Sequence, residues 1–298
     1  MSSNILPTDS IDAAAARGAV ASKRRVKVIR PPAFSLLGVA RDLSALVQYR
    51  DLLYTLSVHR VKVRYKQSLL GFAWSVVQPL SLMLIYTLIF TVIAKVPSNG
   101  TPYAVFAFVA LLLWTYFSNA LTNATGGLVS HSHLVTKVYF PREILPLTYV
   151  IAALFDLIIA SGVLAGLMAY YRVPLTANAL YAVPIVAVLT LFVASTSLLL
   201  SATQVRFRDI GMAMPLMLQI WMFATPVVYP LSQVPERFRT LYMLNPMVGI
   251  IENFRRVIIQ GTHPDFSSLA VSALFSLILL PASYLYFKRV EATLADVI

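Results

Sequence analysis

The chain has 298 residues, of which 58% are hydrophobic and 12% are charged, and it carries a net charge of +12. A soluble domain has about 25% charged residues, so this composition excludes an ordinary soluble protein and indicates a membrane protein. The positive charge does not indicate a nucleic-acid partner, because the cations gather in the termini and in the connections between apolar segments. The sequence contains no cysteine, which excludes disulfides, thiolate metal sites and thiol nucleophiles.

Residues 1–35 are predicted to form a disordered, basic leader in the cytoplasm, because Ala, Ser and cations dominate it as far as Pro31 and Pro32. The leader has no short apolar core followed by a cleavage site, so we expect no signal peptide there. Residues 36–298 are predicted to form a single membrane domain.

An amphipathic helix is predicted over residues 43–67, directly before the first apolar span. Its apolar residues recur at helical spacing and are Leu43, Val47, Tyr54, Val58, Val61 and Tyr65. The cations that flank this stripe are Arg60, Lys62, Arg64 and Lys66. Such a helix lies in the membrane interface with its cations toward anionic headgroups. A charged anchor before the first span is the alternative, and the alternation of residues 61–66 favours a strand locally.

Six apolar stretches are each long enough to cross a bilayer as a helix, because about 20 residues at about 1.5 Å rise cover about 30 Å of hydrocarbon. They lie at residues 69–94, 102–124, 147–170, 179–202, 212–230 and 267–287. An even number of spans places both termini on one side. Most of the 24 lysines and arginines fall in the leader, the second and fourth connections and the tail, so both termini are predicted to be cytoplasmic.

The connection after the second span, residues 130–146, is predicted to hold a short cytoplasmic helix that Pro141 ends. Tyr139 and Phe140 are expected to be exposed with charged residues directly after them. An aromatic pair between charges suits docking into a groove on another protein. An interfacial aromatic anchor would account for the pair equally well.

The longest connection, residues 231–266, contains a second structured segment. Asn245 can cap a helix, Pro246 suits its first position, and Gly261 can end it. Its apolar stripe consists of Met247, Ile250, Ile251, Phe254, Val257 and Ile258, and Glu252 is spaced to pair with Arg256. About 15 residues reach only about 22 Å, so this helix is expected to dip into the outer mouth without spanning. It is either a lid over a pore or a passive interfacial helix.

Ionisable residues are scarce within the expected spans. Asp156 lies in the middle of the third, where an unpaired carboxylate costs about 2.5–3.5 kcal/mol on insertion scales. A proton or ion relay needs several such groups in different helices, and no cation is expected inside the membrane to answer this one. We therefore interpret Asp156 as a carboxylate bonded inside the bundle, with a relay as the alternative.

Aromatic residues are the other notable feature of the spans, and some of them are expected to face a conduit in which sugar rings can stack. The candidates are Phe72, Trp74, Tyr86, Phe90, Trp114, Tyr116, Phe117, Trp221, Phe223 and Tyr229. Aromatic residues near span ends also form belts at the level of the headgroups, which is the alternative interpretation.

Nucleotide and metal motifs are missing from the sequence. It contains neither G-x-x-x-x-G-K-[ST] nor H-E-x-x-H, and its four histidines are scattered. We therefore expect no ATP hydrolysis by a phosphate-binding loop and no metal site in this chain.

Five segments, in order along the chain, resemble the membrane subunits of type-two ABC exporters that secrete polysaccharides such as O-antigen and teichoic acid. They are YKQSLLGFAWSVVQP at 65–79, KVYFPREILP at 137–146, VRFRDI at 205–210, LNPM at 244–247 and the C-terminal FKRVEATLADVI. The resemblance covers about residues 45–298 and leaves the basic leader outside it.

This resemblance implies an all-α permease in the bacterial inner membrane that exports a lipid-linked polysaccharide. Two copies would form the pore, and two copies of a separate ABC ATPase would bind ATP and Mg, so this chain would hold no cofactor. The implied ATPase-coupling residues are Leu134, Lys137, Tyr139, Phe140, Pro141, Arg142 and Glu143. Those of the cytoplasmic entrance helix are Arg60, Lys62, Arg64, Tyr65 and Lys66, and those of the outer gate are Asn245, Pro246, Ile250, Glu252, Phe254 and Arg256. The aromatic residues of the first, second and fifth spans would line the channel.

Two other functions stay open at this point. A type-two ABC exporter of a drug or a lipid would have the same architecture with a smaller cargo. A membrane glycosyltransferase or acyltransferase would need a cluster of histidines or carboxylates at the interface, and the sequence does not provide one.

Overall fold

Helices make up all the regular structure in the part of the chain that the computed structural model describes, which is residues 48–66, 71–93, 101–131 and 140–297. Side chains in these ranges are described except for Phe72 and residues 292–297. The prediction of an all-α membrane protein is confirmed. The predicted leader lies outside the described residues.

Five described helices are long and apolar enough to cross a membrane. They are α4 (Trp74–Thr87) with the π-helical segment Leu88–Ile93, α5 (Tyr103–Ser130), α7 (Ile144–Tyr170), α8 (Ala182–Arg206) with the 3₁₀ turn Ala177–Tyr181 before it, and α12 (Phe266–Val297). They correspond to the first, second, third, fourth and sixth expected spans.

The fifth expected span is shorter than the sequence suggested. Helix α9 (Asp209–Phe223) has 15 residues, and the chain then turns instead of continuing to residue 230. Pro226 lies in this turn, and proline both lacks an N–H group and disfavours helical backbone at the residue before it. The apolar stretch is therefore divided into a helix and an irregular segment.

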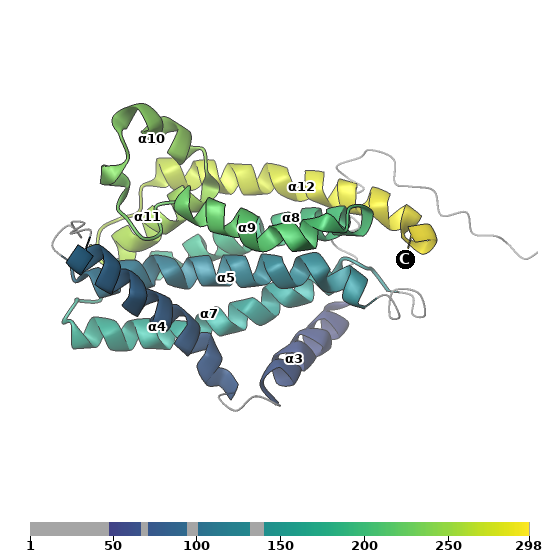
Figure 1. The fold of residues 1–298 in the computed structure, drawn as a ribbon, viewed down its shortest axis with the longest axis horizontal. Helices are drawn as coiled ribbons and strands as arrows, with labels where there is room; N and C mark the ends of the chain where they lie inside the picture. The colour runs from purple at the N-terminus through teal and green to yellow at the C-terminus, as the bar shows by residue number, and fades with distance from the viewer. Residues whose placement is uncertain (1–47, 67–70, 94–100, 132–139, 298) are drawn as a thin grey trace, which may run out of the picture. The chain divides into compact units, whose positions relative to one another are not determined.

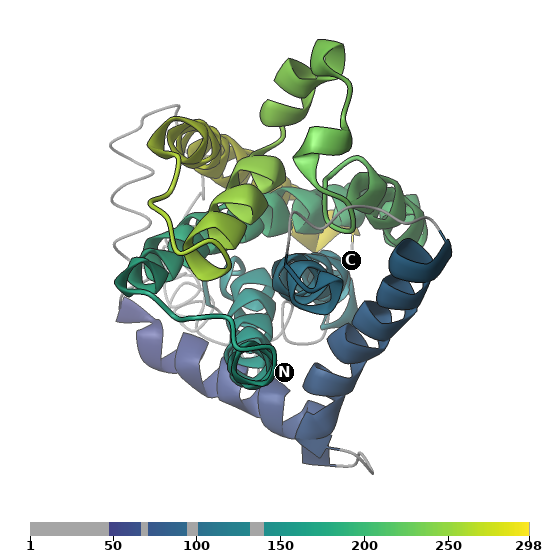
Figure 2. The ribbon, with the colours of Figure 1, turned by 90° about the vertical axis from the view of Figure 1, so that its left-hand side faces the viewer.

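Helix α5 forms the centre of the bundle. Its most apolar window is 89% buried, whereas that of α4 is 11% buried. Viewed along the bundle, α5 stands in the middle with the other long helices around it (Figure 2). All five long helices are strongly apolar, so hydrophobicity alone does not select α5 for the centre, and the packing of the other helices around it decides this position.

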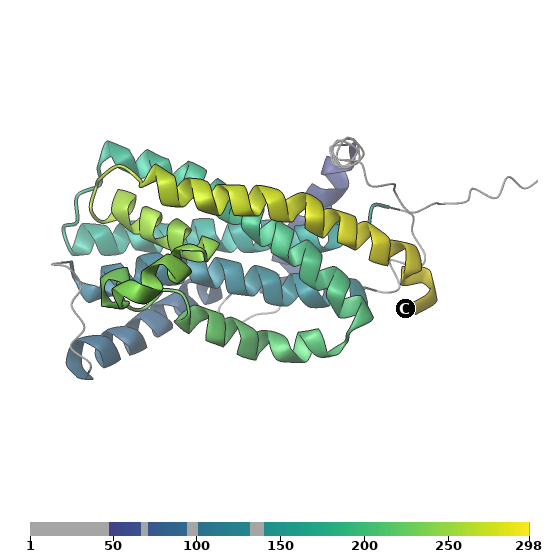
Figure 3. The same ribbon diagram turned by 90° about the horizontal axis from the view of Figure 1, so that it is seen from above.

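The bundle has two distinct ends (Figure 1). At one end α7 begins and α12 finishes. We call it the inner end, following the predicted orientation. The other, outer end holds α10 (Glu236–Met243) and α11 (Pro246–Ile258). Helix α12 runs the length of the bundle from one end to the other, packed most extensively against α8 (Figure 3).

Candidate functional site

The amphipathic segment before the first span forms α3 (Arg50–Lys66), and this helix packs against α7. Near its end, Arg64 and Tyr65 both donate hydrogen bonds to the carboxylate of Asp156. Asp156 lies about 18 Å along α7 from the first residue of that helix. The carboxylate in the middle of the third span is therefore paired, as expected of a group bonded inside the bundle.

The cation that pairs with Asp156 is Arg64 of α3, which corrects the expectation that no cation would pair with it. One turn earlier, Arg60 Nε donates to Thr148 Oγ1 at 2.6 Å, and its guanidinium carbon lies 3.6 Å from the centroid of the Tyr149 ring. Arg60 and Arg64 thus contact α7 and do not extend toward headgroups as predicted. An unpaired carboxylate within a span is costly, so the contact with Arg64 lowers the cost of placing Asp156 there.

The face of α3 that contacts the bundle differs from the predicted apolar stripe. Lys62 and Lys66 are exposed, Tyr65 is buried, and Tyr54 is 71% exposed although it belongs to the predicted apolar stripe. Burial, together with the hydrogen bond to Asp156, raises the pKa of the Tyr65 hydroxyl to about 12, so this group stays protonated and donates. Burial lowers the pKa of the Arg60 guanidinium.

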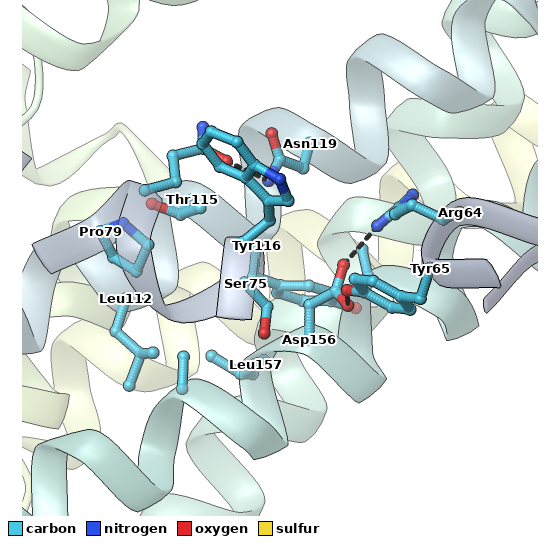
Figure 4. A pocket seen from close by; sticks show the side chains of 14 residues that line it. Arg64, Tyr65, Ser75, Pro79, Leu112, Thr115, Tyr116, Asn119, Asp156 and Leu157 are labelled. Atoms are coloured by element: carbon cyan, nitrogen blue, oxygen red, sulfur yellow. Dashed lines mark hydrogen bonds and ion pairs between the residues drawn. The ribbon is translucent and has the colours of Figure 1, made fainter. Parts of the chain in front are cut away.

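A cavity of about 150 Å³ lies beside these contacts, between α3, α4, α5 and α7 (Figure 4). Asp156 lines it together with Trp74 and Gln78 from α4 and Tyr116 and Asn119 from α5. The structure thus brings two of the predicted channel aromatics to the same cavity as Arg64 and Tyr65 of the predicted entrance helix. Its lining combines aromatic rings with amide and carboxylate groups.

The other predicted channel aromatics are dispersed. Trp114 and Phe117 lie in the hydrophobic core, where the Phe117 ring stacks on Phe192 with centroids 5.7 Å apart and meets Trp221 edge-on at 5.0 Å. These two side chains fill the interior of this chain, and their role in lining a channel stays a prediction. Four other members are partly buried: Tyr86, Phe90, Trp221 and Tyr229. Phe223 is 48% exposed. The side chain of Phe72 lies outside the described residues.

At the inner end, the residues that follow the predicted coupling helix bond to the last helix. Glu143 is 2% exposed and accepts hydrogen bonds from Tyr284 Oη at 3.2 Å and Lys288 Nζ at 2.8 Å. Lys288 Nζ also donates to Glu291 Oε2 at 2.8 Å, and Arg142 Nη1 donates to the Glu291 carbonyl at 3.1 Å. We call Arg142, Glu143, Tyr284, Lys288 and Glu291 the inner cluster.

The inner cluster corrects the expectation that Arg142 and Glu143 simply flank an exposed aromatic pair. Phe140 is half-buried and packs against an apolar group formed by Leu128, Leu145, Leu198, Ala202, Val205, Tyr284, Phe287 and Val290. These residues come from four helices, so the end of the connection is fixed to the inner end of the bundle. Pro141 is half-buried beside it, whereas Leu134, Lys137, Tyr139 and the predicted short helix lie outside the described residues.

At the outer end, α11 begins where the capping signals predicted. The Asn245 side chain accepts a hydrogen bond from the Met247 backbone N–H at 3.1 Å, and Pro246 occupies the first turn. Asn245 also accepts from Trp221 Nε1 at 3.3 Å and donates to Thr225 Oγ1 at 2.9 Å, which ties the cap to the end of α9 and the turn after it.

Helix α11 penetrates the bundle and is buried along most of its length. The predicted gate residues Pro246, Ile250 and Phe254 are buried against neighbouring helices, whereas Arg256 is exposed. Glu252 pairs with Arg255 at 2.8 Å, three residues later, and not with Arg256 as predicted. Arg255 is the closer partner because it faces the bundle together with the apolar stripe.

Arg255 is the functional candidate that the sequence reasoning missed. It is 2% exposed, and it donates to the carbonyls of Pro226 at 2.8 Å and Val227 at 2.6 Å while its guanidinium carbon lies 3.7 Å from the centroid of the Phe106 ring. Burial lowers the pKa of Arg255, and the Glu252 carboxylate opposes that shift. A signal was present: position 255 falls on the apolar stripe, four residues after Ile251.

Among the described residues, no three histidines, aspartates or glutamates stand close enough together to hold a metal ion. The contacts described above are ion pairs and hydrogen bonds between elements that are distant in the sequence. They join α3 to α7, the 130–143 connection to α12, and α11 to the turn after α9.

Comparison with known proteins gives consistent matches over most of the chain. Residues 51–259 match the family model described as "ABC-2 type transporter". The O-antigen export system permease protein RfbA of Myxococcus xanthus is 35% identical over 259 residues, which cover 86% of this chain and 98% of that protein. A protein of the same name from Klebsiella pneumoniae is 25% identical over 83% of this chain and 95% of its own length. The polysialic acid transport protein KpsM of Escherichia coli is 24% identical over 81% of this chain and 94% of its own length.

Proposed function

This chain belongs to the ABC-2 type transporter family, and from that premise we propose that it is the permease of an exporter that moves a lipid-linked polysaccharide out of the bacterial cytoplasm. The observation that carries the proposal is the 35% identity to an O-antigen export permease over 98% of that protein's length. The similarity covers 86% of this chain. Two of the three reported relatives are named for O-antigen export, and the third is named for polysialic acid transport.

A separate ABC ATPase, present in two copies, supplies the energy. The absence of a phosphate-binding loop from the sequence supports this division of labour. The ATPase contacts the 130–143 connection, whose end is held to the bundle through Glu143. Two copies of the permease form the passage in the inner membrane, with both termini in the cytoplasm as the distribution of lysines and arginines predicts.

Within each permease, the residues described above have separate tasks. Helix α3 lies at the cytoplasmic entrance, where Arg64 and Tyr65 hold it to Asp156 beside the cavity. Helix α11 lies at the outer exit, and Arg255 fixes the turn that precedes it. The passage opens when the ATPase displaces the 130–143 connection.

An exporter of a drug or a lipid is the second candidate function, because the family fold alone does not select the cargo. A cellular experiment separates the two. Deleting the gene in its host should abolish the surface polysaccharide and cause lipid-linked chains to accumulate inside the cell. Restoring the unmodified chain should reverse both effects, and a chain lacking residues 137–143 should reverse neither. An unchanged surface polysaccharide after deletion would refute this cargo.

A further inference from the structure

Helix α12 physically connects the two ends of the bundle. From Ser268 to Lys288 it rises about 30 Å. Pro281 interrupts its backbone bonding, but α8 supports both halves: Phe192 contacts Phe275 with ring centroids 6.1 Å apart, and the inner apolar group holds the part after Pro281. A supported helix moves as a unit along its axis, so a displacement at one end reaches the other if both ends are attached.

The inner end of α12 is attached to the connection that precedes α7. Glu143 is almost completely buried and accepts from two residues of α12, Tyr284 and Lys288. Lys288 bridges to Glu291, which in turn contacts Arg142. The four charges balance, and both acidic groups have a cationic partner, so the cluster has no unpaired charge inside the bundle.

The outer end of α12 is attached to α11. Ser272 Oγ donates to the Pro246 carbonyl at 2.9 Å, and Asn253 Nδ2 donates to Ser268 Oγ at 2.8 Å. The helices are so close that a Cβ atom on Gly249 would lie 2.4 Å from Ser272 Oγ. Two helices in contact through a glycine and serine hydroxyls cannot slide past each other without losing these bonds.

We propose that Lys288 is a positioning residue for energy coupling: through Glu143 it makes α12 move with the 130–143 connection, and α12 delivers that motion to α11 at the outer end. This inference rests on the proposed function, because it takes the connection to be where the ATPase acts. It assigns α12 the task of linking ATP binding to the outer exit.

The test uses the whole transporter and one introduced cysteine. The chain contains no cysteine, so Gln260→Cys, at an exposed position two residues after the end of α11, provides a single labelling site in this chain. In the complex with its ATPase, ATP plus vanadate should change the rate of maleimide labelling of this cysteine at least threefold. Lys288→Met should reduce that response to less than half, although labelling without nucleotide stays the same. The matched control is Arg208→Met, which removes an exposed cation at the inner end and should keep the full response.

Two combined variants separate positioning from simple folding. Glu143→Gln with Lys288→Met removes both charges, so the chain should accumulate normally while the response stays lost. Glu143→Lys with Lys288→Glu, combined with Glu291→Gln to remove the carboxylate that would repel the new one, restores an ion pair and should recover at least half of the response. If Lys288→Met does not accumulate, the neutral double variant gives the same answer.

The possible results distinguish a failure of this inference from a failure of the proposed export function. A full response in the neutral double variant would overturn the inference, as would a transporter that exports polysaccharide without any nucleotide response at Gln260→Cys. A complex that hydrolyses ATP but exports no polysaccharide would refute the proposed function instead.

Discussion

Among the described residues, each end of the bundle buries one charged side chain almost completely, and the two side chains have different kinds of partner. At the inner end, Glu143 accepts hydrogen bonds from the side chains of Tyr284 and Lys288. At the outer end, Arg255 donates to the backbone carbonyls of Pro226 and Val227. Side-chain partners join two elements that can move together or separate, whereas carbonyl partners fix the path of the chain. Glu143 therefore connects the start of α7 to α12, whereas Arg255 fixes the backbone of the turn after α9.

The outer arrangement also solves a problem specific to membranes. The turn after α9 interrupts a helix, and its carbonyls would cost several kcal/mol if they were left unbonded in a bilayer. Arg255 can satisfy two carbonyls at once because its guanidinium carries several donors in a planar fork. A short fifth helix is tolerated because α11 supplies the missing donors.

The largest effect on stability is expected at the contact between Glu143 and Lys288. Lys288→Met leaves the buried carboxylate of Glu143 without a cation, which should lower the free energy of unfolding by about 3–5 kcal/mol. Thermal unfolding of the chain purified in detergent measures this loss. Arg208→Met, at an exposed position, should change it by less than about 0.5 kcal/mol. If Glu143→Gln failed to recover stability in the Lys288→Met background, the pair would not be the cause.

A somewhat smaller loss of stability is expected when Arg255 no longer bonds to the turn after α9. Arg255→Met removes the donor to two carbonyls, so the loss should be about 2–4 kcal/mol. Arg256→Gln is the matched control and should be neutral to within about 0.5 kcal/mol, because Arg256 is exposed and Glu252 pairs with Arg255. Equal losses for the two variants, measured in the same unfolding assay, would contradict the assignment of Arg255.

A third variant tests the contact between α3 and α7. Asp156→Asn removes the charge that pairs with Arg64, whose side chain is 34% exposed, so water screens part of the loss. We expect about 1–2 kcal/mol. Limited proteolysis should also cleave α3 faster in this variant than in the exposed control Asp209→Asn. Equal rates of cleavage in both variants would show that Asp156 does not hold α3.

The smallest effect should come from a single hydroxyl. Tyr284→Phe removes one donor to Glu143 and leaves Lys288 in place, which should cost about 0.5–1.5 kcal/mol. A double-mutant cycle with Glu143→Gln should show that the two effects are not additive. Additive effects would mean that the hydroxyl and the carboxylate do not interact.

The sequence predicted those features that local rules determine. The membrane requires about 20 apolar residues for each span, so the five long helices were predicted with only their ends shifted. The start of α11 was predicted because Asn245 and Pro246 act within a few residues of themselves. The early end of α9 had a signal in Pro226, but the apolar run through residue 230 concealed it.

The remaining features depend on contacts between distant residues. Arg64 and Asp156 are 92 positions apart, and helical periodicity on either segment does not show that they meet. The buried position of Phe117 follows from α5 being central, which the other helices decide. Glu143 looked like a surface charge because its partner, Lys288, lies 145 positions away.

Transport by a purified system tests the proposed export function. Vesicles that contain this chain and its ATPase should move a lipid-linked polysaccharide to the opposite face only when ATP is supplied, and vesicles with this chain alone should move none. Translocation by the chain alone against a gradient, or a complete system that hydrolyses ATP without moving the polysaccharide, would contradict the account.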